Sequence, residues 1–173
     1  MLSVEQPLPQ FSGEALLPNG EFAPVNLSDY KGKWLVLFFY PLDFTFVCPT
    51  EIRGFNELHS EFSKLNTVVL GASVDSVHCH KAWTESSLGK IAFPLIGDLT
   101  RSLAQDCGVL SEEGFSHRAT FVANPDGIIE SVTVNSSNVG RSPQETLRVV
   151  QALQAGGLAP CDWQPGQSLL NAA

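Results

Sequence analysis

The chain lacks several features that would mark out common protein classes. It has only 10 Lys and Arg residues against 18 Asp and Glu, a formal net charge of -8, which argues against nucleic acid or an anionic membrane surface as a partner. No apolar run approaches the ~18–20 residues that span a bilayer. The first residues hold neither a basic start nor an apolar stretch, so we expect a cytoplasmic protein without a secretory signal.

Cysteine is sparse and widely spaced. The four thiols, at positions 48, 79, 107 and 161, show no short paired spacing, so they match neither a zinc site nor a compact disulfide framework. His78, Cys79 and His80 are adjacent, but successive residues of a helix point in different directions and do not converge on one ion. We therefore predict no metal site, and we expect Cys79 and Cys107 to be partly buried spectators.

The composition predicts an ordinary globular protein. The 173 residues are 43% hydrophobic and 16% charged, and they contain neither an internal repeat nor a linker. A chain of this length buries roughly two-thirds of its unfolded surface in one core. We assign residues 1–157 to one domain and residues 158–173, which have no hydrophobic period, to an extended C-terminal tail that carries Cys161.

Strand and helix signals alternate along the domain. The strand pattern covers residues 11–15, 22–26, 34–40, 67–74, 119–123 and 128–134, with a short apolar piece at 93–96. The helix pattern covers residues 48 to about 65, 77–87, a stretch capped by Thr100 that runs to about 106, and a stretch from Ser142 to Gly156. This order predicts an α/β thioredoxin-like fold, with a central mixed sheet flanked by helices and an N-terminal hairpin extension.

The apolar strand at 34–40 leads directly to Cys48, which stands where a helix begins. The N–H groups and the dipole of a helix start favour a thiolate by up to ~1–2 kcal/mol, and the thiolate is the nucleophilic form of cysteine. A buried structural cysteine is the alternative. Thr45, three residues earlier, favours a reactive sulfur at a partly open helix end, because its hydroxyl is in range of the thiolate or of an oxygen substrate.

Pro41, Thr45 and Cys48 stand in the arrangement Pro-x-x-x-Thr-x-x-Cys, which resembles the signature of the peroxiredoxins. The similarity extends from about residue 4 to about residue 170 and is closest to typical two-cysteine members of the bacterial alkyl hydroperoxide reductase type. It implies a thioredoxin-like fold and a thiol peroxidase without a cofactor, acting on hydrogen peroxide and organic hydroperoxides.

The resemblance also implies a role for each residue that matches the family pattern. Cys48 is then the peroxidatic cysteine, which forms a sulfenic acid, and Thr45 and Arg118 activate it. Pro41 shelters the sulfenate from solvent. Glu51 and Arg141 match positions that support the arginine.

Cys161 matches the resolving cysteine of this family. The resemblance implies that it forms a disulfide with Cys48, in typical members between two subunits of a homodimer. A decamer of five dimers is the larger assembly common in such families. The electron donor is expected to be thioredoxin or a flavoprotein disulfide reductase.

Three other functions remain open at this point: a redox sensor, an oligomeric holdase chaperone and a thiol-disulfide oxidoreductase. The last of these requires Cys-x-x-Cys at the helix start, where Thr45 replaces the first cysteine. Oxidation-sensitive relatives carry a Gly-Gly-Leu-Gly insertion and a terminal helix with Tyr-Phe. This chain has Ser86-Ser87-Leu88-Gly89 in the comparable region and neither Tyr nor Phe after Cys161, so we predict resistance to overoxidation.

Overall fold

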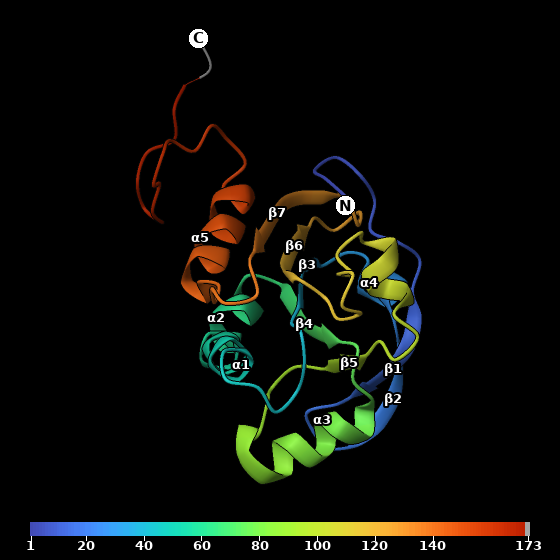
Figure 1. The fold of residues 1–173 in the computed structure, drawn as a ribbon. Coiled ribbons are helices and arrows are strands. Elements are labelled where there is room, and N and C mark those ends of the chain that lie inside the picture. Colours follow the sequence, from blue (N-terminus) through green and yellow to red (C-terminus); the bar gives the residue numbers. More distant parts are fainter. Residues whose placement is uncertain (172–173) are drawn as a thin grey trace.

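A seven-stranded sheet runs through the computed structural model, which describes residues 1–171 (Figure 1). The strand order is β2-β1-β5-β4-β3-β6-β7. β3 pairs with β4 and β4 with β5 in parallel, while the other neighbours pair antiparallel, so the predicted mixed sheet is confirmed. The strands are β1 (Ser12–Leu16), β2 (Phe22–Asn26), β3 (Trp34–Phe39), β4 (Thr67–Ser73), β5 (Leu95–Gly97), β6 (Arg118–Ala123) and β7 (Ile129–Asn135).

Helices cover both faces of this sheet. Figure 1 shows α1, α2 and α5 together on one side of the strands and α4 on the other. The central strand β3 alternates between the two cores: Val36 and Phe38 pack with α1, α2 and α5, while Leu35 and Leu37 pack with α4. The helical elements are η1 (Leu27–Tyr30), α1 (Cys48–Glu57), α2 (His59–Lys64), α3 (Val77–Trp83), the π-helical η2 (Thr84–Leu88), α4 (Ser102–Asp106) and α5 (Pro143–Gln154).

The helix predicted from Cys48 to about Leu65 is in fact two helices. Leu58 separates α1 from α2 with φ -93° and ψ 1°, outside the helical values, so the hydrogen-bond ladder is interrupted there. Phe55 of α1 and Phe62 of α2 are both fully buried. Because the apolar period continues across the break, the sequence pattern gives no sign of it.

The cap predicted for α4 is also wrong. The N-cap residue is Arg101, in the left-handed region with φ 63°, and not Thr100. The free N–H groups of the first turn are satisfied by Asp98, whose two carboxylate oxygens accept from the N–H groups of Leu103 and Ala104 at 3.1 and 2.8 Å. A carboxylate that approaches from the preceding loop thus replaces the hydroxyl cap.

The cap predicted for α5 is half confirmed. Ser142 Oγ accepts from the Glu145 N–H at 3.2 Å, as in a capping box. The Glu145 carboxylate does not complete the box, because both of its oxygens accept from Arg148 at 2.7 Å.

The tail after α5 projects away from the sheet (Figure 1). As predicted, its described residues, 158–171, form neither a helix nor a strand. The segment nevertheless closes on itself, since the Leu170 N–H donates to the Leu158 carbonyl at 2.8 Å and Trp163 is only 5% exposed. Within residues 1–171, no helix has the length and apolar character that a bilayer crossing requires.

Candidate active site

Cys48 is the first residue of α1, as predicted. Val47 is the N-cap residue, and its carbonyl accepts from the N–H groups of Thr50 and Glu51 at 3.0 and 3.4 Å. Pro49 occupies the first turn, where no backbone donor is needed. The Cys48 side chain is 0% exposed, so the partly open position that we expected is wrong for this state. Any substrate therefore reaches the sulfur through local opening of the site.

Arg118 lies against this sulfur although it is 70 residues away in the chain. It is the first residue of β6, which pairs antiparallel with β3, the strand that leads into the Cys48 loop. Its Nη1 lies 3.3 Å from the Cys48 Sγ, and its Nε donates to the Ser137 carbonyl at 2.8 Å. The guanidinium is held from two sides and directs one donor at the thiol.

Glu51 joins Arg118 to Arg141, so the structure brings together the three residues that match the family pattern. The Glu51 Oε2 accepts from Arg118 Nη1 and from Arg141 Nη2, the latter at 3.0 Å, and Oε1 accepts from Arg141 Nε at 2.8 Å. Arg141 also donates to the Ala119 carbonyl at 2.8 Å and lies over the Phe38 ring at 5.3 Å. All three ionic side chains are buried, so each needs its partners.

The charges of this cluster do not cancel. Burial raises the pKa of Glu51, but hydrogen bonds and charge from Arg141, together with the charge of Arg118, outweigh it and hold the pKa below the ordinary carboxyl range. Two guanidinium groups and one carboxylate therefore leave one positive charge beside the Cys48 sulfur.

Pro41 and Thr45 frame the loop before Cys48. Pro41 is buried and Thr45 is half-buried. The Thr45 hydroxyl donates to the Leu42 carbonyl at 2.9 Å, so in this state its proton is directed at the backbone and not at the sulfur. Its oxygen keeps lone pairs that accept a hydrogen bond. Phe44, between them, has φ 54°, a left-handed conformation that is unusual for a bulky residue and typical of a constrained functional loop.

A buried polar network that the sequence analysis missed anchors this loop. The Asp43 carboxylate lies 2.7 Å from His80 Nδ1 and accepts from the Tyr40 hydroxyl at 3.0 Å, while the Asp43 N–H donates to Asp75 at 2.9 Å. His80 Nε2 lies 3.1 Å from the Ile96 carbonyl, so both ring nitrogens face oxygen atoms and the ring is held from two sides. Tyr40 is only three residues from Asp43, but the other partners lie 16 to 37 residues apart, beyond the reach of a local pattern.

The other two thiols are poor nucleophiles. Burial, together with the Asp43 and Asp75 charges, raises the pKa of Cys79 to about 12. Burial and nearby carboxylates raise the pKa of Cys107 to about 12 as well. Cys79 is partly buried, as predicted, whereas Cys107 is fully buried, so that part of the prediction is wrong.

Adjacent His78, Cys79 and His80 diverge, as the helix argument predicted. His78 packs edge-on against Phe22, whereas His80 faces Asp43. The Cys79 sulfur instead lies with oxygens of Asp43 and Asp75, all within 4.8 Å of one another. The carboxylates of both aspartates already accept internal hydrogen bonds, so this group is explained without an ion.

Cys161 is exposed in the tail, apart from the buried Cys48 cluster. It lies in the turn in which the Trp163 N–H donates to the Pro160 carbonyl at 3.1 Å. Both Cys48 and Cys161 are free thiols in this state.

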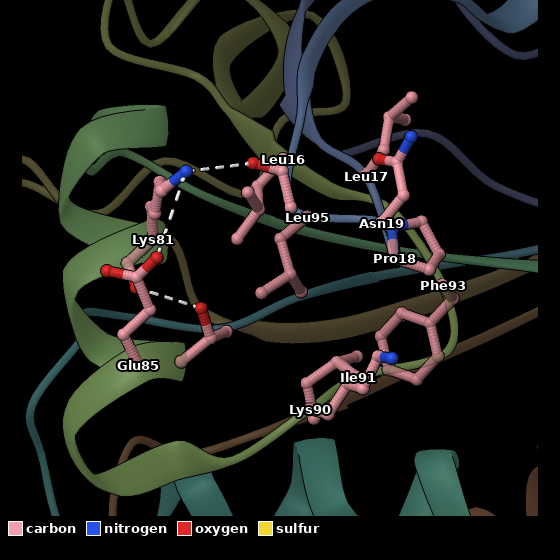
Figure 2. A pocket seen from close by; sticks show the side chains of 12 residues that line it. Leu16, Leu17, Pro18, Asn19, Lys81, Glu85, Lys90, Ile91, Phe93 and Leu95 are labelled. Atoms are coloured by element: carbon pink, nitrogen blue, oxygen red, sulfur yellow. Dashed lines mark hydrogen bonds and ion pairs between the residues drawn. The ribbon is translucent and has the colours of Figure 1, made fainter.

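A second hollow lies between the β1–β2 turn, α3, η2 and β5, separate from the cysteine site (Figure 2). Its volume is about 210 Å³, and its floor is formed by Leu16, Ile91 and Leu95. The Lys81 ammonium at its edge donates to the Gly20 carbonyl at 3.1 Å and lies 3.8 Å from the Glu85 carboxylate. Its charge is therefore already matched within the chain.

Comparison with known proteins identifies the family to which this site belongs. The model of the AhpC/TSA family matches residues 4–132. The chain belongs to the AhpC/TSA family. Among its relatives, Peroxiredoxin-2 of Bos taurus is 49% identical, over 96% of this chain and 88% of the relative. A peroxiredoxin of Cynops pyrrhogaster is 47% identical over the same shares of the two chains.

Solved structures of peroxiredoxins share the fold. The reduced 2-Cys peroxiredoxin of Plasmodium vivax superposes with a TM-score of 0.94 and 36% identity, over 97% of this chain and 92% of that one. AhpC of Mycobacterium tuberculosis gives 0.83 and 36% identity, over 89% and 99%. The predicted thioredoxin-like fold and the resemblance to typical two-cysteine peroxiredoxins are both confirmed. This peroxiredoxin is an enzyme, a thiol-dependent peroxidase.

Proposed function

We propose that this peroxiredoxin reduces hydrogen peroxide and organic hydroperoxides at Cys48, with Arg118 as the group that activates the sulfur. The observation that carries the proposal is the 3.3 Å approach of Arg118 Nη1 to the Cys48 Sγ at a helix start. A fixed guanidinium in a buried site stabilises both the thiolate and the oxygen that leaves when the O–O bond of the hydroperoxide breaks.

The first chemical step is a displacement at oxygen. The Cys48 thiolate attacks the terminal oxygen of the hydroperoxide, an S–O bond forms and the O–O bond breaks. The leaving hydroxide or alkoxide takes a proton and departs as water or alcohol, and Cys48 becomes a sulfenic acid. Negative charge moves from sulfur to the leaving oxygen in this step, so the donor fork of Arg118 serves both ends of the reaction.

The remaining loop residues hold the substrate in place. Thr45 accepts a hydrogen bond from the hydroperoxide through the lone pairs of its hydroxyl, and Pro41 shields the sulfenate from water. Glu51 and Arg141 orient Arg118 through the buried ion pairs. They are positioning residues, and they act through the guanidinium that faces the sulfur.

Cys161 completes the cycle from the tail of residues 158–173. The Cys161 thiol attacks the Cys48 sulfenic acid, the S–S bond forms and water leaves. This disulfide joins two subunits of a homodimer. Five such dimers assemble into a decamer. Thioredoxin or a flavoprotein disulfide reductase then reduces the disulfide. Its exposed position and the irregular tail support this role. The cytoplasmic location expected from the sequence stays a prediction.

Two cysteine variants test the proposal. Cys48→Ser is expected to abolish peroxide reduction, because no other thiol in this site is activated. Cys161→Ser is expected to consume one equivalent of peroxide per chain and then stop, since the sulfenic acid has no internal partner. Peroxide consumption with a protein dithiol reductant, together with a nonreducing gel that detects the covalent dimer, measures both outcomes. Normal turnover by Cys161→Ser would refute the two-cysteine assignment.

The same measurement separates the alternatives. A holdase chaperone does not need a fast reaction of Cys48, and a redox sensor passes its oxidation to a client protein and does not need to turn over with a protein dithiol reductant alone. Multiple turnovers of peroxide by the purified wild-type chain therefore distinguish a peroxidase from either.

A further inference from the structure

The turn that carries Cys161 is held at one end. The turn runs from Pro160 to Trp163, closed by the hydrogen bond from the Trp163 N–H to the Pro160 carbonyl at 3.1 Å. The Trp163 indole is buried and its Nε1 donates to the Gln167 carbonyl at 3.0 Å. Cys161 is exposed beside this anchor, so the position of its sulfur depends on whether Trp163 stays in place.

Arg148 of α5 ties this anchor to the body of the protein. Its Nη1 donates to the Trp163 carbonyl at 3.0 Å. Among the described residues, 1–171, no other hydrogen bond joins a side chain of α5 to the tail. Nε and Nη2 bind the two oxygens of Glu145 at 2.7 Å each, which fixes the plane of the guanidinium. The Arg148 side chain is 22% exposed, so this contact is only partly screened by water.

The local charges agree with this arrangement. The hydrogen bonds that Arg148 donates to Glu145 raise the pKa of Arg148, partly offset by desolvation, and the charges of Glu145 and Asp162 raise it further. An open hollow of about 590 Å³ lies between α5 and the turn, lined among others by Arg148, Pro160 and Cys161. The turn is therefore supported at Trp163, with open space beside the sulfur.

We infer that Arg148 is the latch of the tail, a positioning residue that holds the Cys161 turn on α5 and sets how often Cys161 is released to react with oxidised Cys48. The inference rests on the proposed function. Cys48 is buried and Cys161 is exposed on the tail, so the two sulfurs bond at ~2 Å only after a rearrangement, and in this inference the turn leaves its place on α5 as part of it. Breaking the hydrogen bond from Arg148 to the Trp163 carbonyl is part of that departure.

The latch sets the outcome of a competition for the Cys48 sulfenate. In one reaction the Cys161 thiol displaces water from the sulfenic acid and forms the disulfide. In the other a second hydroperoxide molecule oxidises the sulfenate to a sulfinic acid and is itself reduced to water or alcohol. A tail that is released more often favours the disulfide, so loosening the latch is expected to lower the sulfinate yield.

Rapid mixing of the reduced full-length chain with hydrogen peroxide tests this inference. Trp163, two residues from Cys161, provides a fluorescence signal for tail release. The first phase, whose rate rises with peroxide concentration, reports oxidation of Cys48, and the second, independent of peroxide, reports disulfide formation. In Arg148→Met we expect an unchanged first phase and a second phase about three- to tenfold faster, the effect of losing one hydrogen bond of ordinary net strength from a partly exposed donor. The sulfinate per turnover, measured by mass spectrometry, is expected to fall.

Two further variants and one control sharpen the result. Arg148→Lys keeps a donor and is expected to return the second phase towards the wild-type rate, while Glu145→Gln, which only loosens the guanidinium, is expected to accelerate it less than Arg148→Met. Lys64→Met breaks the equivalent i,i+3 ion pair with Glu61 on α2, 2.7 Å long and remote from the tail, and is expected to change neither phase.

The outcomes keep the two proposals apart. Loss of the first phase in the wild-type chain would refute the peroxidase assignment itself. A normal first phase, with a second phase in Arg148→Met that is unchanged or slower, would refute the latch and leave the peroxidase assignment standing.

Discussion

Arg118 meets Cys48 because β6 runs beside β3, not because the two residues are close in the chain. Its guanidinium is held by the Ser137 carbonyl and by Glu51, which leaves one N–H directed at the sulfur. A lysine in its place offers the same charge without this planar arrangement of donors.

Arg118→Lys is therefore expected to slow the reaction of Cys48 with hydrogen peroxide by ~10²–10³-fold, the range seen when one preorganised donor is removed from a reaction site. The rate is read from the first phase after rapid mixing. Arg53→Lys is the matched control, since Arg53 donates to the carbonyls of Ser87 and Leu88 and is expected to leave this rate within about twofold. Equal loss in both variants would contradict a specific role for Arg118.

Glu51 makes the free energy of unfolding depend on pH in the acid range. Its folded pKa is held below the ordinary carboxyl value of ~4.3, so its stabilising effect is fully present above that value and is lost as the pH falls through the lower folded pKa. Glu51→Gln leaves two buried guanidinium groups uncompensated, which is expected to lower the free energy of unfolding by ~3–5 kcal/mol at pH 7.

Urea unfolding between pH 7 and pH 3 measures this pH dependence of the unfolding free energy. The difference in unfolding free energy between wild type and Glu51→Gln is expected to be constant near neutral pH and to shrink below about pH 4, where the wild-type carboxylate takes up its proton. A difference that grows with falling pH would show that Glu51 is not held as a carboxylate by the arginines.

Only some residues of the candidate site could be predicted from the sequence. Cys48, Glu51, Arg118 and Arg141 were identified from their match to a family pattern, and the structure brings them together. The network around Asp43 was missed, because its partners come from the residues that follow β3 and β4, from α3 and from β5, and no single segment shows a periodic signal.

At the level of helices and strands, the apolar period predicted which face of each element is buried but not where each element ends. The break at Leu58 leaves the period intact, and the cap of α4 comes from Asp98 in the loop before it, so neither was visible in the pattern. Ser142 was correctly identified, since a hydroxyl followed by proline at the first helical position is a local signal.

Ser142→Ala tests the cap of α5, the helix that carries Arg148. Loss of the hydrogen bond to the Glu145 N–H is expected to lower the unfolding free energy by ~1 kcal/mol and the melting temperature by ~2–4 °C. Differential scanning calorimetry gives both values. Thr100→Ala is the control, because Thr100 does not cap α4 and bonds only with the Ser102 hydroxyl among its described contacts. An equal change in the two variants would contradict the capping role.

For the whole molecule, fold class was the most predictable property. The order of strands and helices, with short connections, leaves few arrangements of a mixed sheet, and the observed order of seven strands is one of them. Burial of Cys48 was not predictable, because it depends on contacts from several elements at once.

Resistance to overoxidation is a prediction about the whole chain. The segment Ser86-Ser87-Leu88-Gly89 ends a short π-helical turn, and no helix follows α5 in the described residues 155–171, so little packs over the site to delay release of the tail. With thioredoxin present, mass spectrometry is expected to find only a trace of Cys48 sulfinate during turnover at low peroxide. Abundant sulfinate under these conditions would show the prediction to be wrong.

The break between α1 and α2 determines how far a disturbance at Cys48 spreads. A helix frays from its end because its hydrogen bonds form a cooperative ladder, and fraying stops where the ladder stops. The ladder of α1 holds 10 residues and ends at Leu58, while α2 is fixed separately by buried Phe62. We therefore expect any unwinding that exposes the Cys48 sulfur to end within α1. The helix α2 then stays packed on the sheet while the first turn of α1 opens and closes.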